Sequence, residues 1–389
     1  MGDFAKTSDP EGVSHAHSIR VNNPAAKTGG LIIERIPVAV LGSSGLVAQR
    51  LQQRLVNHPW FELVAVAGSE GRVGQPLSSI AWRLDDGKPD LPPITVEPLD
   101  DRRRVAHLVR AGVKVAFSAL PADVAKRVEP LWASCGIAVF SNASAFRRVA
   151  GVPLVVPEVN PESMLMMGHL DRPMACATNC TLLPLLLPLT ALCEAFGLTS
   201  WSMRSEQALS GGGYGLIDRV ASSGVWPAEI EGEAEKTEAE FRHLLDWNGE
   251  AELTCERVNR QDGHHVFVEA VLGQSVDDHG VVEAIRTWSE RATPKHLPSA
   301  PTRCVMTVDK VDPTVHLLAN GHDFPSSSDP TVDLTSGMAV VVGAIETNGN
   351  TVRFEGFSHN TLRGAAGGTV YLAELALDLG LLGPTQAQG

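Results

Sequence analysis

The chain has 389 residues, 43% of them hydrophobic, a length that suggests two domains or one domain interrupted by another. Its 45 acidic and 32 basic residues give a formal net charge of −13, which argues against nucleic acid or an anionic membrane as the main partner. The six cysteines include no CxxC pair, which predicts reduced thiols in a cytoplasmic protein and no structural metal site.

Residues 1–34 are polar and contain no apolar stretch of the signal-peptide type. Acidic residues in this segment also fit a mitochondrial presequence badly. We therefore expect a disordered N-terminal tail that takes no part in the fold.

Residues 36–68 have the pattern of a βαβ unit. Val38–Leu41 form a continuous apolar run that suits a parallel strand buried on both faces, residues 46–56 have helical apolar spacing, and residues 61–68 form a second strand. Strand and helix patterns go on alternating up to residue 145. This alternation predicts a Rossmann-type doubly wound dinucleotide-binding domain over residues 35–173, completed by a C-terminal helix within 359–389.

The turn after the first strand has the spacing of a dinucleotide fingerprint, with Gly42, Gly45 and a small Ala48. Glycine is needed where the backbone must approach a phosphate, and the following helix offers free N–H groups. After the second strand, Glu70 suits the ribose 2′-hydroxyl of NAD, whereas Ser69 and Arg72 suit the 2′-phosphate of NADP. The pattern favours NADP and leaves NAD open.

The sequence changes character at about residue 174. A helix is expected from Cys180, followed by a strand that ends in a three-glycine turn, an acidic amphipathic stretch over 229–245, and longer strands with few crossover helices. This pattern predicts an α+β catalytic and dimerisation domain with a mixed sheet over residues 174–358.

One cysteine and one histidine stand out in this second region. Most lone cysteines are inert core residues, but Cys180 lies where a helix begins, and His264 follows Asp-Gly at the start of a strand. A thiol and an imidazole are the minimum set for thiol-based acyl chemistry. His264 and His265 are adjacent on a strand, so at most one of them faces the site.

These motifs, in this order, resemble the aspartate-β-semialdehyde dehydrogenase family, in the branch that also contains malonyl-CoA reductases. The matches are "LGSSGLVAQRL" and "VAFSALP" for the cofactor, "SNASAFR" with "VPLVVPEVNP", "TNCT" for the nucleophile, "QALSGGGYG", "EGEAEK" and "SHNTLRGAAGG". They run through nearly all of the part expected to fold.

The resemblance implies a role for each matching residue. Cys180 would be the nucleophile, His264 the general acid/base, and Gln207 would orient the thioester intermediate. Arg257 would bind the substrate carboxylate and Glu233 its ammonium group, while Lys236, Arg147 and Asn142 would bind phosphate. The residues implied at the cofactor are Gly42, Ser43, Ser44, Gly45, Leu46, Val47, Ser69, Arg72, Ser118, Ala119, Leu120, Pro121, Ser210, Gly211, Asn360, Gly367 and Gly368.

The implied reaction is the reversible, NADP-dependent reductive dephosphorylation of an acyl phosphate, L-aspartyl 4-phosphate, in amino-acid biosynthesis. A reductase of an acyl-CoA such as malonyl-CoA, using the same thioester chemistry, is the enzyme alternative, and a binding paralogue without turnover is the alternative from another class. Glu233 and Arg257 favour an amino acid, because an acyl-CoA needs no ammonium site. The expected partners are a small substrate, inorganic phosphate and further copies of the chain, as a homodimer or homotetramer.

Overall fold

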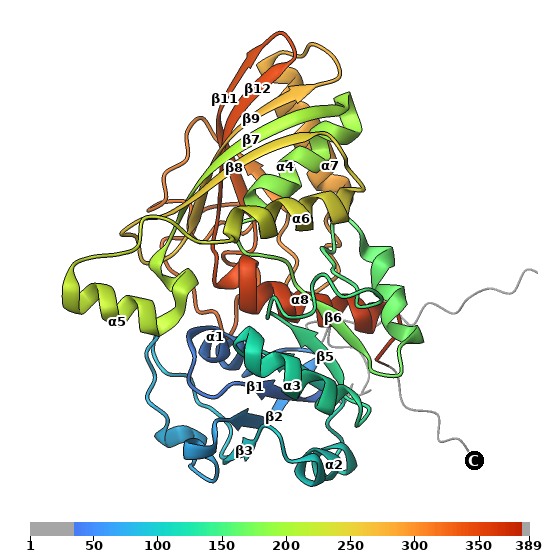
Figure 1. Cartoon of the computed structure of the whole chain (residues 1–389), viewed down its shortest axis with the longest axis vertical. Coiled ribbons are helices and arrows are strands. Elements are labelled where there is room, and N and C mark those ends of the chain that lie inside the picture. The colour runs from blue at the N-terminus through green and yellow to red at the C-terminus, as the bar shows by residue number, and fades with distance from the viewer. Residues whose placement is uncertain (1–34, 383–389) are drawn as a thin grey trace, which may run out of the picture. The chain divides into compact units, whose positions relative to one another are not determined.

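The N-terminal half is built on a six-stranded, all-parallel sheet, in a computed structural model that describes residues 35–382 (Figure 1). The strand order β3-β2-β1-β4-β5-β6 is that of a doubly wound sheet, which confirms the Rossmann prediction. The strands are β1 (Ile36–Leu41), β2 (Phe61–Gly68), β3 (Val96–Pro98), β4 (Val115–Ser118), β5 (Ala138–Ser141) and β6 (Met174–Cys176).

Helices cover both faces of this sheet, which explains why its central strands are apolar on both sides. α1 (Leu46–Leu55) and the C-terminal α8 (Gly367–Asp378) share one apolar core with the sheet. α2 (Arg102–Arg110) and α3 (Ala122–Ala133) share the other. The C-terminal helix thus returns to the nucleotide-binding sheet.

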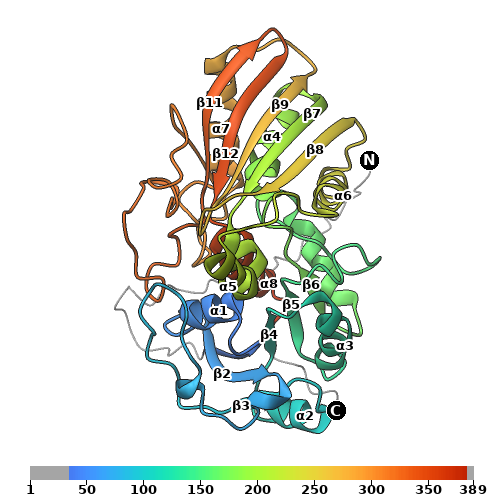
Figure 2. The ribbon, with the colours of Figure 1, turned by 60° about the vertical axis from the view of Figure 1, so that its left-hand side comes forward.

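The second sheet is mixed and has the order β10-β11-β12-β9-β7-β8 (Figures 1 and 2). Its core lies against α4 (Leu183–Phe196) and α7 (Asp278–Ala292), whose apolar side chains are buried on the sheet. Its strands are β7 (Leu198–Gln207), β8 (Glu250–Arg257), β9 (His264–Leu272), β10 (Val305–Thr307), β11 (Val340–Asn348) and β12 (Thr351–Ser358).

The remaining elements of the described chain are two helices and five short helical turns. α5 (Gly213–Ser223) and α6 (Glu233–Leu245) follow β7 along the chain. Short helical turns are η1 (Glu70–Arg72), η2 (Leu77–Ser79), η3 (Pro161–His169), η4 (Leu209–Gly212) and the π-helical η5 (Leu362–Ala366).

Two expected boundaries were wrong. The first sheet extends to Cys176, because β6 pairs with β5, so the change of sheet comes after this strand and not at residue 174. α4 begins at Leu183 and not at Cys180, because the Asn179 side chain accepts the Thr181 N–H at 2.8 Å and shapes a turn before the helix.

The expected tail over residues 1–34 lies outside the described residues, and so does the end of the chain after residue 382. The division into separate domains stays a prediction. None of the helices within residues 35–382 combines the length and the apolar character that crossing a bilayer requires.

Candidate active site

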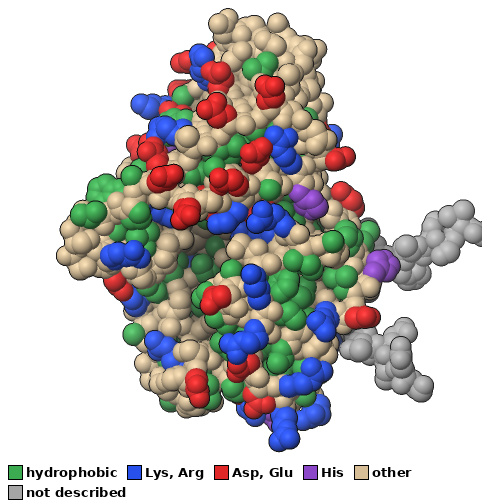
Figure 3. All heavy atoms as spheres, viewed as in Figure 1, with side chains coloured by type: hydrophobic (Ala, Val, Ile, Leu, Met, Phe, Trp, Pro, Cys, Tyr) green, Lys and Arg blue, Asp and Glu red, His purple; other side chains and the backbone are tan. Residues whose placement is uncertain are grey.

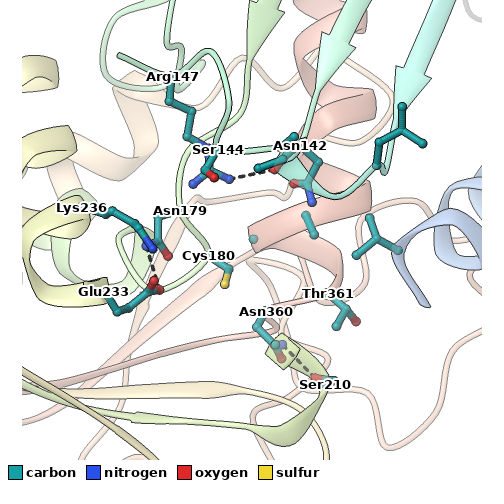
Figure 4. Close-up of a pocket in the computed structure, with 17 residues that line it drawn as sticks. Asn142, Ser144, Arg147, Asn179, Cys180, Ser210, Glu233, Lys236, Asn360 and Thr361 are labelled. Atoms are coloured by element: carbon teal, nitrogen blue, oxygen red, sulfur yellow. Dashed lines mark hydrogen bonds between the residues drawn. The ribbon is translucent and has the colours of Figure 1, made fainter. Parts of the chain in front are cut away.

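A cavity of about 270 Å³ lies where the nucleotide-binding sheet meets α6 and the turn before α4. Figure 3 shows a hollow at this level of the surface, with basic side chains gathered near its rim. Figure 4 shows the Cys180 sulfur among the polar side chains of this cavity. The polar residues that line it include Asn142, Ser144, Arg147, Asn179, Cys180, Ser210, Glu233, Lys236, Asn360 and Thr361.

Cys180 lies in the turn between β6 and α4 and is partly exposed to the cavity. Its Sγ is 3.2 Å from Nε2 of His264, the first residue of β9. Burial raises the pKa of the Cys180 thiol to about 12; Glu233 raises it further, while Arg147 and Arg257 oppose the rise. The thiol is therefore protonated at neutral pH in the free protein.

A backbone contact sets the tautomer of neutral His264, that is, which ring nitrogen carries the proton. The Ala208 N–H donates to Nδ1 at 3.1 Å, so a neutral imidazole carries its proton on Nε2 and presents it to the sulfur. Burial, and then the charges of Arg257 and Arg260, lower the pKa of His264 well below its ordinary value. His265 lies on the opposite side of the strand, 3.2 Å from Glu355 and stacked on Phe267.

Asn179 connects the nucleophile turn to α6. Its Nδ2 donates to Glu233 at 2.8 Å (Figure 4). Its backbone N–H donates to Glu240 at 2.7 Å, and its Nδ2 also donates to Thr237 at 3.3 Å. The three α6 residues are four and three positions apart, so they share one face of the helix. This face of α6 therefore holds Asn179, the residue immediately before Cys180, in place.

Two cations face the cavity. Arg147 donates to the Asn142 carbonyl at 2.8 Å and lies 3.2 Å from Glu240, while its Nε is buried without a hydrogen-bond partner. Lys236 lines the cavity and, within residues 35–382, forms no ion pair. A small anion would offer both groups a partner.

Two of the expected residues, Arg257 and Gln207, do not line this cavity. Arg257 is 9% exposed, donates to the Ala208 carbonyl at 2.7 Å, and has an unpartnered Nε. Burial lowers its pKa, while Cys180, when ionised, and Glu233 raise it. The structure does not bring Gln207 to the cavity: its side chain is buried and donates to Ser205, two residues earlier on the same side of β7.

A second cavity continues from the first along the nucleotide-binding sheet. Asn142, Ser210 and Gly211 line both this groove and the first cavity. Of the residues expected at the cofactor, those that line the groove are Ser44, Gly45, Leu46, Val47, Arg72, Ala119, Leu120, Pro121, Ser210 and Gly211.

The shape of the glycine-rich turn fits a dinucleotide. A Cβ on Gly45 would have no atom within 4 Å, so this position leaves open space beside the start of α1. Gly42 has a φ of +118°, and a Cβ there would lie 3.1 Å from the Ala48 Cβ, which explains a small residue at each position. Arg72 lies in the groove, which suits a 2′-phosphate.

Other residues expected at the cofactor do not line this groove. Ser43 and Ser118 are buried, and Ser69 is exposed. Asn360 lines the catalytic cavity, donating to Ser210 at 2.8 Å and accepting the Gly263 N–H at 2.7 Å.

Gly367 and Gly368 line neither cavity and pack closely at the start of α8, so their contact with the cofactor stays a prediction. A Cβ on Gly367 would lie 2.5 Å from the Met338 sulfur, and one on Gly368 would lie 2.4 Å from the Arg363 carbonyl oxygen. These glycines are required by close packing of the helix. In the same motif Gly364 takes the position beside the site, where a Cβ would lie 2.5 Å from the Cys180 Cβ.

Sequence reasoning also missed residues that only the fold brings to the site. Arg83 and Tyr214 line the groove, with the Arg83 guanidinium 4.1 Å above the Tyr214 ring. Glu240 is 2% exposed behind the nucleophile turn. No local pattern marks Arg83 or Glu240, and the motif "QALSGGGYG" contains Tyr214 without indicating its contact with Arg83, because these contacts join segments far apart in the chain.

Comparison with known proteins agrees with this geometry. Residues 37–166 match the model of the semialdehyde dehydrogenase NAD-binding domain. An aspartate-semialdehyde dehydrogenase of Archaeoglobus fulgidus is 34% identical over 88% of this chain and 98% of its own length. A malonyl-CoA reductase (NADP) of Metallosphaera sedula is 27% identical, covering 89% of this chain and 98% of that protein.

A solved structure shows the same fold over most of the chain. The aspartate-semialdehyde dehydrogenase of Candida albicans, crystallised with NADP, is 26% identical and superposes with a TM-score of 0.72, covering 90% of this chain and all of that one. The fold, the contact between Cys180 and His264, and the sequence similarity over most of the chain all indicate the same family. The chain belongs to the aspartate-semialdehyde dehydrogenase family.

Proposed function

We propose that this chain catalyses the reversible, NADP-dependent reductive dephosphorylation of L-aspartyl 4-phosphate to L-aspartate 4-semialdehyde. The observation that carries this function is the Cys180 sulfur, 3.2 Å from His264 Nε2, in a cavity that also holds Glu233, Arg147 and Lys236. A nucleophile, a proton donor and both signs of charge are thus available within one cavity.

The thiol chemistry begins with attack of the sulfur on the acyl carbon. A carbon–sulfur bond forms, the carbon–oxygen bond to phosphate breaks, and the acyl group becomes a thioester of Cys180. Because Nε2 of His264 already carries a proton, it can accept the thiol proton only as its own proton moves to the oxygen of the tetrahedral adduct, and that proton leaves with phosphate when the adduct collapses to the thioester. His264 therefore acts first as a donor to the developing oxyanion.

Bound NADPH would supply the hydride that reduces the thioester, held by the turn at 44–47, residues 119–121 and Arg72. The hemithioacetal anion would collapse by breaking the carbon–sulfur bond, which releases the aldehyde and the Cys180 thiolate; a proton from solvent then restores the thiol. A thiolate is a good leaving group as well as a good nucleophile, so one cysteine serves both steps.

The charged side chains of the site support a substrate with ammonium, carboxylate and phosphate groups. Glu233 faces the cavity from the first turn of α6, where it would pair with the ammonium group of the substrate, and Arg257 would bind its carboxylate through a bidentate fork. Arg147 and Lys236 would bind the leaving phosphate, and Asn142, whose Oδ1 is buried without a partner, lies beside them.

The alternative acyl acceptor is CoA, as the name of the Metallosphaera sedula relative indicates for that protein. The acyl acceptor is tested by following NADPH formation from L-aspartate 4-semialdehyde with inorganic phosphate or with CoA. We expect turnover that saturates with phosphate and is not supported by CoA. Turnover that requires CoA and ignores phosphate would replace the acyl phosphate by an acyl-CoA, with Cys180 keeping its role.

We also propose that the protein acts in the cytoplasm as a homodimer or homotetramer. The face of the second sheet opposite α4 and α7 supports self-association, because Arg204, Phe267 and Arg353 line an open groove there. Light scattering coupled to size-exclusion chromatography measures the oligomer, and a monomer across the micromolar range would contradict this proposal.

A further inference from the structure

We infer that Glu240 is a positioning residue that places both the nucleophile and the phosphate-binding arginine; this inference rests on the proposed function. Glu240 belongs to α6, is 2% exposed, and uses its two carboxylate oxygens for two different partners. Oε2 accepts the backbone N–H of Asn179 at 2.7 Å, and Oε1 lies 3.2 Å from Nη1 of Arg147.

The first contact fixes the turn that carries the thiol. Asn179 immediately precedes Cys180, and its N–H would have no partner in the buried turn without the carboxylate. The same residue is held through its side chain by Glu233 and Thr237 on the same face of α6. Rotation of the Asn179 peptide would therefore move the Cys180 sulfur relative to His264.

The second contact fixes the direction of the arginine. With Nη1 on Glu240 and Nη2 on the Asn142 carbonyl, the guanidinium of Arg147 has two of its three nitrogens occupied by the protein. The third nitrogen, Nε, has no partner in the structure. This arrangement holds Arg147 in one orientation at the wall of the cavity that contains Cys180 (Figure 4).

Stability alone is a weak reason for this pair. Both side chains are at least nine-tenths buried, at 10% and 3% exposure. The desolvation of a buried ion pair commonly offsets its attraction, so an apolar pair of similar volume would stabilise the fold as well. A carboxylate that bridges the nucleophile turn and a cation at the cavity wall has a use that an apolar pair would lack.

The two contacts can be separated by substitution. In Glu240→Gln the amide oxygen can still accept the Asn179 N–H, but the amide N–H₂ faces Arg147 and cannot accept from it. We expect the KM for phosphate in aldehyde oxidation to rise about tenfold or more, the size expected for one lost hydrogen bond to a charged group. The NADP Kd should stay close to wild type, whereas the Tm should fall because Arg147 loses its buried counter-charge.

Glu240→Ala removes both contacts. In addition to the higher phosphate KM, we expect a lower kcat and an altered rate of Cys180 alkylation by iodoacetamide, followed on the Cys180 peptide by mass spectrometry. If this variant fails to fold, the phosphate KM of the isosteric Glu240→Gln variant alone tests the inference. The matched control is Glu238→Gln on the same helix, since Glu238 pairs with Arg242 at 32% exposure; its kinetics should be those of wild type.

The opposite results overturn the inference. A purely electrostatic role of Glu240 predicts tighter phosphate binding in Glu240→Gln, because a negative charge beside Arg147 is lost, so a fall in the phosphate KM would contradict positioning. A phosphate KM equal to that of Glu238→Gln would do the same. If wild type shows no phosphate-dependent turnover, the proposed function fails, and the alkylation rates of Glu240→Ala and Glu238→Gln still decide whether Glu240 positions Cys180.

Discussion

Replacing Gly364 by alanine tests how closely the π-helical turn η5 must pack on the nucleophile. The new Cβ would lie 2.5 Å from the Cys180 Cβ, 2.9 Å from its Cα and 3.4 Å from its carbonyl oxygen. Carbon atoms in favourable contact are about 3.5–4.0 Å apart, so the two segments must separate by about 1 Å. The obstacle is backbone and a short side chain, which have no rotamer that relieves the contact.

A displacement of this size at a reacting atom lowers turnover by about 10²-fold. We expect this loss in kcat for Gly364→Ala, with a slower or faster Cys180 alkylation and an NADP Kd close to wild type. Gly87→Ala is the matched control, because a Cβ there would have no atom within 4 Å. A Gly364→Ala enzyme with wild-type kcat and alkylation rate would refute the close packing of η5 on Cys180.

Three further outcomes follow from the site. His264→Gln should lower kcat/KM by about 10²-fold or more, the usual effect of a lost acid/base group, while His265→Gln should do less because its ring lies against Glu355; a reversed order would contradict the assigned orientation. Arg72→Ala should weaken binding of NADP much more than of NAD in titrations of each cofactor, and equal losses would exclude a contact to the 2′-phosphate. Because burial raises the pKa of Cys180 to about 12, its alkylation in the free protein should rise about tenfold per pH unit up to pH 10, whereas a plateau near the ordinary 8.5 would contradict the buried thiol.

The sequence was sufficient for features that depend on neighbouring residues. The sequence predicted the buried strand at Val38–Leu41, the glycine turn after it and the helix beyond. Strand burial and turn geometry depend on the types and spacing of neighbouring residues. The opposite orientations of His264 and His265 followed from the two-residue period of a strand. Cys180 and His264 were identified together through their motifs, and the structure places them 3.2 Å apart.

Features that depend on tertiary contact were not predictable in the same way. Gln207 pairs with Arg257 at the end of β7, yet its side chain is buried and donates to Ser205, and this contact could not be read from the sequence. The motif after Asn360 contains three glycines, and spacing alone could not show that Gly364, rather than Gly367 or Gly368, packs on Cys180. Glu240 and Arg147 are 93 positions apart, so their pairing has no local signal.

The central claim is that Cys180 carries the acyl group, and it is tested most directly by trapping that group. The protein is incubated with L-aspartyl 4-phosphate without cofactor, quenched in acid and digested, and the peptides are measured by mass spectrometry before and after hydroxylamine, which cleaves thioesters. We expect a β-aspartyl adduct on the Cys180 peptide that hydroxylamine removes, and no adduct of this kind in Cys180→Ser. An adduct confined to another cysteine, or turnover that persists in Cys180→Ser, would contradict the account.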